Sequence, residues 1–181
     1  MIDQKGWLAP AIRIESPNQD ERPLNTAVSV LVIHNISLPP GEYGGPWIDD
    51  LFCNRLDSTA HPYFAEISEL KVSSHLLITR TGEIRQYVSF DQRAWHAGES
   101  CFDGQTRCND FSIGIELEGC DDRPYEIKQY EALVDVTHPI QSRYPAISVD
   151  RIIGHSDIAP QRKTDPGDAF EWGRFRAMLA G

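Results

Sequence analysis

The chain has 181 residues, which is enough for one compact domain with a buried core. Hydrophobic residues make up 40% and charged residues 24%, values that are ordinary for a globular protein. The net charge is −10, so the chain lacks the positive surface that nucleic acids and anionic membranes attract. We therefore expect a single ordered domain over residues 1–181 that binds neither nucleic acid nor membrane.

The sequence also carries signals about the compartment. The N-terminal segment has no basic stretch followed by an apolar run, and no run of 18 apolar residues occurs anywhere. None of the four cysteines belongs to a C-x-x-C pair, so we expect free thiols. These features predict a cytoplasmic protein, and no obligatory protein partner is evident. The four cysteines of the chain are Cys53, Cys101, Cys108 and Cys120.

The first half of the chain predicts a loop, a strand and two short helices. Residues 16–27 are polar and rich in turn formers. The run SVLVIH at 29–34 is apolar and β-branched, which is typical of a buried strand that ends at its histidine. After a Gly/Pro loop, apolar residues at helical spacing over 47–56 predict a short helix, and a second short helix is expected around 64–70.

The middle of the chain predicts three further strands. Residues 75–79 and 83–89 flank a turn that contains Gly82, which indicates a β-hairpin. The segment SIGIELE at 112–118 alternates apolar and polar residues, so it should be a strand with two distinct faces.

The longest helical pattern runs over 125–144 and contains Pro139. Proline has no N–H for the carbonyl of Asp135 and disfavours a helical His138, so we expect a kink or a break there. A strand-like segment follows at 151–154, and Asp168 is expected to cap a last helix. This order of elements predicts the α/β class, with a central mixed β-sheet flanked by helices.

Two of the six histidines stand out from the rest, although a lone histidine is more often structural than metal-binding. His34 ends a buried strand, and His155 follows the apolar run at 151–154 and opens a loop that leads to Asp165. Ligands of open α/β sheets bind at the carboxyl ends of strands. Two imidazoles and a carboxylate leave a fourth position for water, which is typical of catalytic zinc. The H-E-x-x-H motif of ordinary zinc proteases is absent.

The polar face of the strand at 112–118 includes two carboxylates, Glu116 and Glu118. Such a carboxylate lies either on a solvated face or in a cleft, and the pattern alone leaves both readings open. Glu118 is nearer the strand end, where solvent or an ion pair would satisfy it.

Four segments in the same order resemble the anhydro-N-acetylmuramoyl-L-alanine amidases of bacterial cell-wall recycling. The resemblance covers essentially the whole chain and implies a fold like that of the zinc amidase and peptidoglycan-recognition superfamily, a mixed sheet flanked by helices. The segments are LVIHNISLPPGEYGGPWID, DQRAWHAGES, CNDFSIGIELEG and GHSDIAPQRKTDPG.

The resemblance implies an enzyme that cleaves the amide bond between the lactyl group of anhydro-N-acetylmuramic acid and L-alanine. It assigns Zn²⁺ to His34, His155 and Asp165. It further makes Glu116 the general acid/base and Lys163 the cation that stabilises the oxyanion. The substrate would be an anhydro-muramyl peptide in the cytoplasm.

Four more residues resemble positions that line the muropeptide cleft of this family: Asn35, Lys71, Trp95 and Arg107. Lys71 stands where the family has arginine, and lysine cannot offer the planar bidentate fork of a guanidinium. Because the substrate carries carboxylates and the chain is acidic, the cleft needs local positive charge. We expect Lys71, Arg107, Arg162 and Lys163 to supply it.

Three other functions remain open. The first is a zinc amidase that acts on intact peptidoglycan, and the second is a non-catalytic muropeptide-binding module of the kind that has lost a metal ligand. The third is a metal-free hydrolase that uses Glu116 and Glu118.

Overall fold

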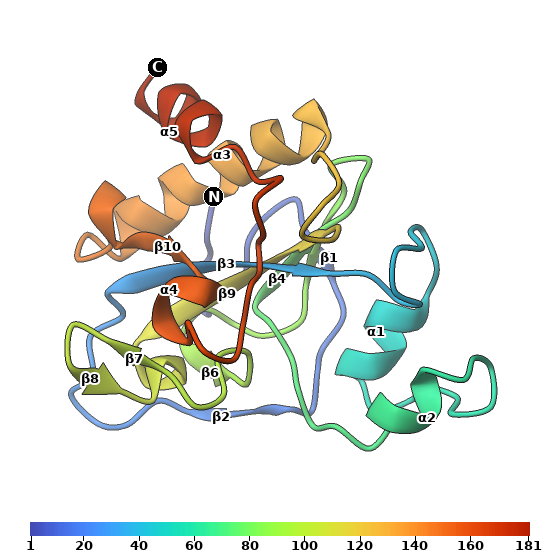
Figure 1. The fold of residues 1–181 in the computed structure, drawn as a ribbon. Coiled ribbons are helices and arrows are strands. Elements are labelled where there is room, and N and C mark those ends of the chain that lie inside the picture. Colours follow the sequence, from blue (N-terminus) through green and yellow to red (C-terminus); the bar gives the residue numbers. More distant parts are fainter.

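A six-stranded mixed sheet forms the centre of the computed structural model, which describes residues 1–181 (Figure 1). Strand β4 pairs antiparallel with β5, while every other neighbouring pair in this sheet is parallel. The α/β class and the mixed sheet are thus confirmed. In spatial order the strands are β1 (Ile12–Arg13), β5 (Ile84–Gln86), β4 (Leu76–Ile78), β9 (Ser112–Glu118), β3 (Val30–Ile36) and β10 (Ile152–Gly154).

Helices cover one face of the sheet and shorter elements cover the other (Figure 1). The first face carries α3 (Ile127–Arg143) and α5 (Trp172–Ala180). The opposite side holds two short helices that pack near each other and a third that follows β10. These are α1 (Trp47–Phe52), α2 (Phe64–Ile67) and α4 (His155–Ile158).

Two small two-stranded sheets and two 3-10 turns complete the structure. The sheets pair β2 (Gln19–Glu21) with β6 (Gln92–Ala94) and β7 (Cys101–Phe102) with β8 (Gln105–Thr106). The 3-10 turns are η1 (Cys108–Asp110) and η2 (Val149–Arg151).

The two central strands, β3 and β9, are parallel and seven residues long. Alternate residues of each strand, such as Leu31 and Ile113, join the core cluster beneath α3 and α5. The intervening residues face the opposite side, where His34 lies beside its register partner Glu116. The predicted alternation of β9 is confirmed. Its polar face is nevertheless not solvated, because all seven residues of β9 are buried.

Of the predicted kink or break at Pro139, the break does not occur, because α3 continues through this residue to Arg143. The carbonyl that loses its helical donor belongs to Asp135, which is exposed, so water can replace the missing N–H. Val136 and Ile140 are buried on either side of the proline and hold the helix against the sheet. Packing therefore outweighs the local cost of the proline.

Asp168 does not cap the last helix, since α5 begins only at Trp172 and Glu171 occupies the cap position. The preceding backbone N–H groups already have other partners. Ala169 donates to the carbonyl of Asp121 at 2.9 Å, and Glu171 donates to the hydroxyl of Tyr130 at 2.9 Å. These bonds keep the segment out of the helix.

Two further features concern the helices and the cysteines. No helix combines the length and the apolar composition that a bilayer crossing requires. All four cysteines are free, with Cys101 exposed and Cys108 buried.

The thiols offer a direct test. Titration of the unfolded protein with a thiol reagent, in the absence of reductant, should find all four. In the folded protein the exposed Cys101 should react first and the buried Cys108 last, because a thiol must be accessible to be modified. A count of two or none in the unfolded protein would show that disulfides form.

Candidate metal centre and cleft

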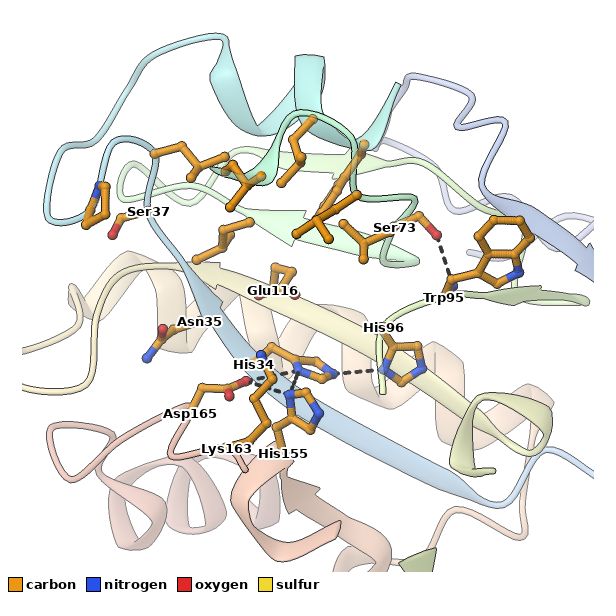
Figure 2. A pocket seen from close by; sticks show the side chains of 18 of the residues that line it. His34, Asn35, Ser37, Ser73, Trp95, His96, Glu116, His155, Lys163 and Asp165 are labelled. Atoms are coloured by element: carbon orange, nitrogen blue, oxygen red, sulfur yellow. Dashed lines mark hydrogen bonds and ion pairs between the residues drawn. The ribbon is translucent and has the colours of Figure 1, made fainter. Parts of the chain in front are cut away.

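Three side chains that are distant in the sequence converge on one point at the carboxyl end of the sheet (Figure 2). His34 comes from β3, His155 begins α4 directly after the neighbouring strand β10, and Asp165 lies on the loop beyond α4. The Nδ1 atoms of the two histidines are 3.0 Å apart. The Oδ2 atom of Asp165 lies 3.0 Å from Nδ1 of His34 and 3.1 Å from Nδ1 of His155.

The chemistry of these donors fits a cation. The Nε2 atom of His155 lies 3.1 Å from the carbonyl oxygen of Ala97, which can only accept, so Nε2 carries the proton. In the neutral ring Nδ1 then bears a lone pair that faces the Asp165 carboxylate with no proton between them. Ligands bound tetrahedrally to zinc at about 2.0–2.1 Å lie about 3.3 Å apart, close to the observed triangle. The three residues therefore suit Zn²⁺ with one position left open.

Two of these groups have the charge state that metal binding requires. Burial lowers the pKa of His34 to about 4, so this ring is neutral at pH 7. Burial opposes the ionisation of Asp165, yet the pKa of that carboxyl is lowered overall, so it is ionised at pH 7. Neutral imidazole and ionised carboxylate are the forms that bind metal.

Glu116 lies next to this centre on β9, opposite His34 in the register. Its Oε2 atom is buried and has no hydrogen-bond partner. Burial raises the pKa of Glu116 well above its ordinary value, and the charge of Asp165 raises it further, while Lys163 lowers it. A carboxylate with a raised pKa and a free oxygen in a cleft has the properties of a general acid/base.

The metal centre opens into a pocket of about 360 Å³ that has a polar and an apolar side. His34, Glu116, Lys163 and Asp165 line the polar side, and Lys163 reaches it from the loop after α4. The apolar side is built by α1, α2 and the segments around them. Its residues are Ile36, Leu38, Pro40, Leu51, Phe52, Tyr63, Ile67, Leu70 and Val72.

Two of the four expected cleft residues, Asn35 and Trp95, line this pocket (Figure 2). The side-chain amide of Asn35 donates to Oδ1 of Asp121 at 2.7 Å and to the carbonyl of Pro166 at 3.1 Å. Both of its amide hydrogens are thereby engaged, and its own carbonyl oxygen remains available to a ligand.

Of the four basic residues expected around the cleft, only Lys163 lines this pocket. Lys71 is exposed, and Arg107 is 69% exposed and pairs with Asp110. Arg162 donates to the carbonyls of Ala97 and Glu99. Sequence reasoning placed these residues by likeness and by charge, neither of which fixes the direction of a long side chain on a loop.

His96 is a pocket residue that the sequence did not single out. Its Nδ1 atom lies 2.8 Å from Nε2 of His34, and its Nε2 atom lies 3.0 Å from the hydroxyl of Ser112. It belongs to the segment DQRAWHAGES, but nothing in that segment distinguishes it from the other histidines. Only the fold brings it against β3 and β9.

Glu118 is not a solvated carboxylate, contrary to expectation. It is buried, and its two oxygens accept the backbone N–H of Gly44 at 2.5 Å and that of Arg80 at 2.9 Å. Glu118 thus ties the loop before α1 to the turn after β4. Its role is structural, which separates it from Glu116 on the same strand face.

A substitution can test this role. The Glu118→Gln variant places an amide NH₂ where one of the two N–H groups now finds an acceptor. The free energy of unfolding should fall by about 1–3 kcal/mol, the cost of an unsatisfied buried donor. Urea denaturation measures it, with the exposed Glu42→Gln as control, expected to change by less than about 0.5 kcal/mol. Equal stability of the two variants would refute the structural role.

Comparison with known proteins gives a consistent picture. The family model described as N-acetylmuramoyl-L-alanine amidase matches residues 24–168, a range that contains every residue of the candidate centre. The chain is 60% identical over 179 residues to the 1,6-anhydro-N-acetylmuramyl-L-alanine amidase AmpD of Enterobacter cloacae, covering 99% of this chain and 95% of that protein.

Two solved structures are also similar. A crystal structure of a selenomethionine derivative of AmpD superimposes with a TM-score of 0.96 at 59% identity and covers 99% of both chains. The amidase AmiD of Escherichia coli, solved with anhydro-N-acetylmuramic acid-L-Ala-D-γ-Glu-L-Lys, superimposes with a TM-score of 0.62 at 30% identity. It covers 99% of this chain and 65% of that one.

Proposed function

Because this chain belongs to the N-acetylmuramoyl-L-alanine amidase family and is an amide hydrolase, we propose that its substrate is an anhydro-muramyl peptide. It would cleave the bond between the lactyl group of anhydro-N-acetylmuramic acid and L-alanine. The observation that carries this proposal is the convergence of His34, His155 and Asp165 beside Glu116 at the polar side of the pocket. The name of the Enterobacter cloacae relative and the ligand of the AmiD complex support the anhydro sugar.

Each residue of the centre has a part in the reaction. A zinc ion held by the three ligands would supply the Lewis acid that polarises the amide carbonyl and activates water at neutral pH. Glu116 takes the proton of the attacking water and returns it to the leaving amine of L-alanine. Its raised pKa suits both transfers. The Lys163 ammonium stabilises the negative charge that develops on the carbonyl oxygen.

The two sides of the pocket suit a substrate of this kind. The scissile amide lies between two methyl-bearing groups, the lactyl and the alanyl, and it is attached to a sugar with a ring face of C–H groups. The apolar side formed around α1 and α2 can pack against these groups while the amide meets the polar side. The free carbonyl oxygen of Asn35 can accept an N–H of the peptide.

We further propose that all of residues 1–181 act as one amidase domain in the cytoplasm. The first and last elements belong to the same body, since β1 pairs with β5 in the central sheet and α5 packs on α3. The free thiols, one of them exposed, support a reducing compartment.

One reaction tests the proposed function. The protein is incubated with anhydro-muramyl tripeptide, with and without a chelator, and release of the free peptide is followed by mass spectrometry. Cleavage should occur only without the chelator and should return when Zn²⁺ is added back. Intact peptidoglycan serves as the second substrate. Faster cleavage of peptidoglycan, or full activity with the chelator present, would contradict the proposal.

The ligand set predicts one zinc ion per chain. The His155→Ala variant removes one of three protein ligands and should lose most of its zinc when purified in parallel with the parent. His138→Ala, which removes an exposed histidine of α3, should keep its zinc. Metal analysis decides the matter, and full occupancy of the His155→Ala protein would exclude this residue as a ligand.

Glu116→Gln preserves the shape of the side chain while removing the base. We expect kcat to fall about 100-fold or more, the usual contribution of a positioned general base, and zinc content to stay the same. Glu118→Gln on the same strand is the matched control and should keep kcat within a few-fold, because Glu118 holds backbone groups outside the pocket lining. If the two variants exchange these results, Glu118 is the base.

A further inference from the structure

We propose that His96 and Ser112 are positioning residues that fix the tautomer of His34, so that its Nδ1 atom is presented to the metal. The inference rests on the proposed metal centre, because it concerns how one of its ligands is oriented. Metal-binding histidines usually donate their other ring N–H to a fixed partner, and that partner decides which nitrogen binds. His155 has such a partner in the carbonyl of Ala97. The partner of His34 is another imidazole, which can donate or accept.

The direction of the hydrogen bonds is set at Ser112. Its hydroxyl oxygen lies 2.6 Å from the carbonyl oxygen of Cys108, which can only accept, so the hydroxyl proton lies between these two atoms. With its proton committed, the Ser112 oxygen accepts from the Nε2 atom of His96 at 3.0 Å. The opposite direction would leave two oxygen lone pairs facing each other at 2.6 Å.

The same reasoning gives the direction of the hydrogen bond between His96 and His34. His96 is half-buried, and neither of its ring nitrogens contacts a carboxylate that would hold a second proton, so the ring carries one proton. Because Nε2 carries its proton, Nδ1 of His96 bears a lone pair, and it accepts from Nε2 of His34 at 2.8 Å. Nδ1 of His34 is then the unprotonated atom, and it is the atom that faces His155 and Asp165 (Figure 2).

The backbone around His96 is built to hold this ring. A Cβ atom at Gly114 would lie 2.5 Å from Cγ of His96, so only glycine leaves room for the imidazole over β9. The side-chain oxygen of Asn109 accepts the N–H of His96 at 3.1 Å and that of Ala97 at 2.8 Å. The dipeptide 96–97 thereby orients both histidine ligands, His34 through a ring and His155 through a carbonyl.

Zinc affinity tests the proposal without reference to turnover. The dissociation constant of zinc is measured by competition with a chromophoric chelator for the parent, His96→Leu, His96→Asn and Ser112→Ala. Loss of such a partner typically weakens metal binding about 10–100-fold, which we expect for His96→Leu. His96→Asn should recover most of this loss, since its oxygen can replace Nδ1 as acceptor. Ser112→Ala should show a smaller loss, because His34 keeps Nδ1 of His96 as its acceptor while the direction of that hydrogen bond is no longer fixed.

His75→Leu is the matched control. His75 is a fully buried histidine whose ring centroid lies 5.8 Å from that of His96. Its Nδ1 accepts from the backbone N–H of Gly114, and its Nε2 lies 3.1 Å from the carbonyl of Gln92, so it contacts no ligand. This variant should lose stability but bind zinc within about threefold of the parent. If it weakens zinc as much as His96→Leu does, the role of His96 is only structural and the proposal fails.

A spectroscopic readout separates this proposal from the proposed metal centre. In the metal-free parent, long-range ¹H–¹⁵N correlation should show His34 protonated at Nε2, and Ser112→Ala should show a mixture of tautomers. A parent protonated at Nδ1 of His34 would overturn the relay even if zinc binds with high affinity. A parent that binds no zinc but shows the Nε2 tautomer would overturn the metal centre and leave the relay standing.

Discussion

The parallel pairing of β3 with β9 is the constraint on which the rest of the site depends. Its register places His34 beside Glu116, so the proposed metal ligand and the proposed general base lie on adjacent strands and point to the same face. The other face of both strands is filled by the core beneath α3 and α5. A shift of one residue in the register of β9 would point the Glu116 side chain into that core. Burial of an unpaired carboxylate there would cost too much free energy for the fold to be stable. The apolar packing on one face of the sheet therefore fixes the positions of His34 and Glu116 on the other face.

Much of this could be predicted from the sequence, because it depends on local pattern. The β-branched run that ends near His34 and the alternation over 112–118 each contain enough residues to define a strand and its faces. The pattern also predicts the α3 helix, but it does not show that the helix continues past Pro139, because local propensity does not include the packing of Val136 and Ile140. The sequence also could not show that the polar face of β9 is buried, because the segments that cover it are remote in the chain.

The least predictable parts of the site are the side chains whose partners are distant in sequence. Glu118 binds backbone groups 74 and 38 residues away, and His96 meets His34 across 62 residues. The sequence also could not show which way the four basic side chains point, and only Lys163 lines the pocket. In a chain of net charge −10, the pocket therefore offers the proposed substrate one cation and a broad apolar side rather than a field of positive charge.

The position of the ligands along the chain has a mechanical consequence. His34 and His155 are 121 residues apart, and β10, which leads into His155, is a three-residue strand at the edge of the sheet. An edge strand this short is held by few backbone bonds and can fray. In the proposed zinc form, the ion would cross-link β3 to the residue that follows β10. This cross-link would close a loop of more than half the chain and hold the edge strand against the centre of the sheet. In that form, zinc occupancy and the integrity of the segment from β10 onward would rise and fall together, so the protein without zinc would be the more easily opened by a protease.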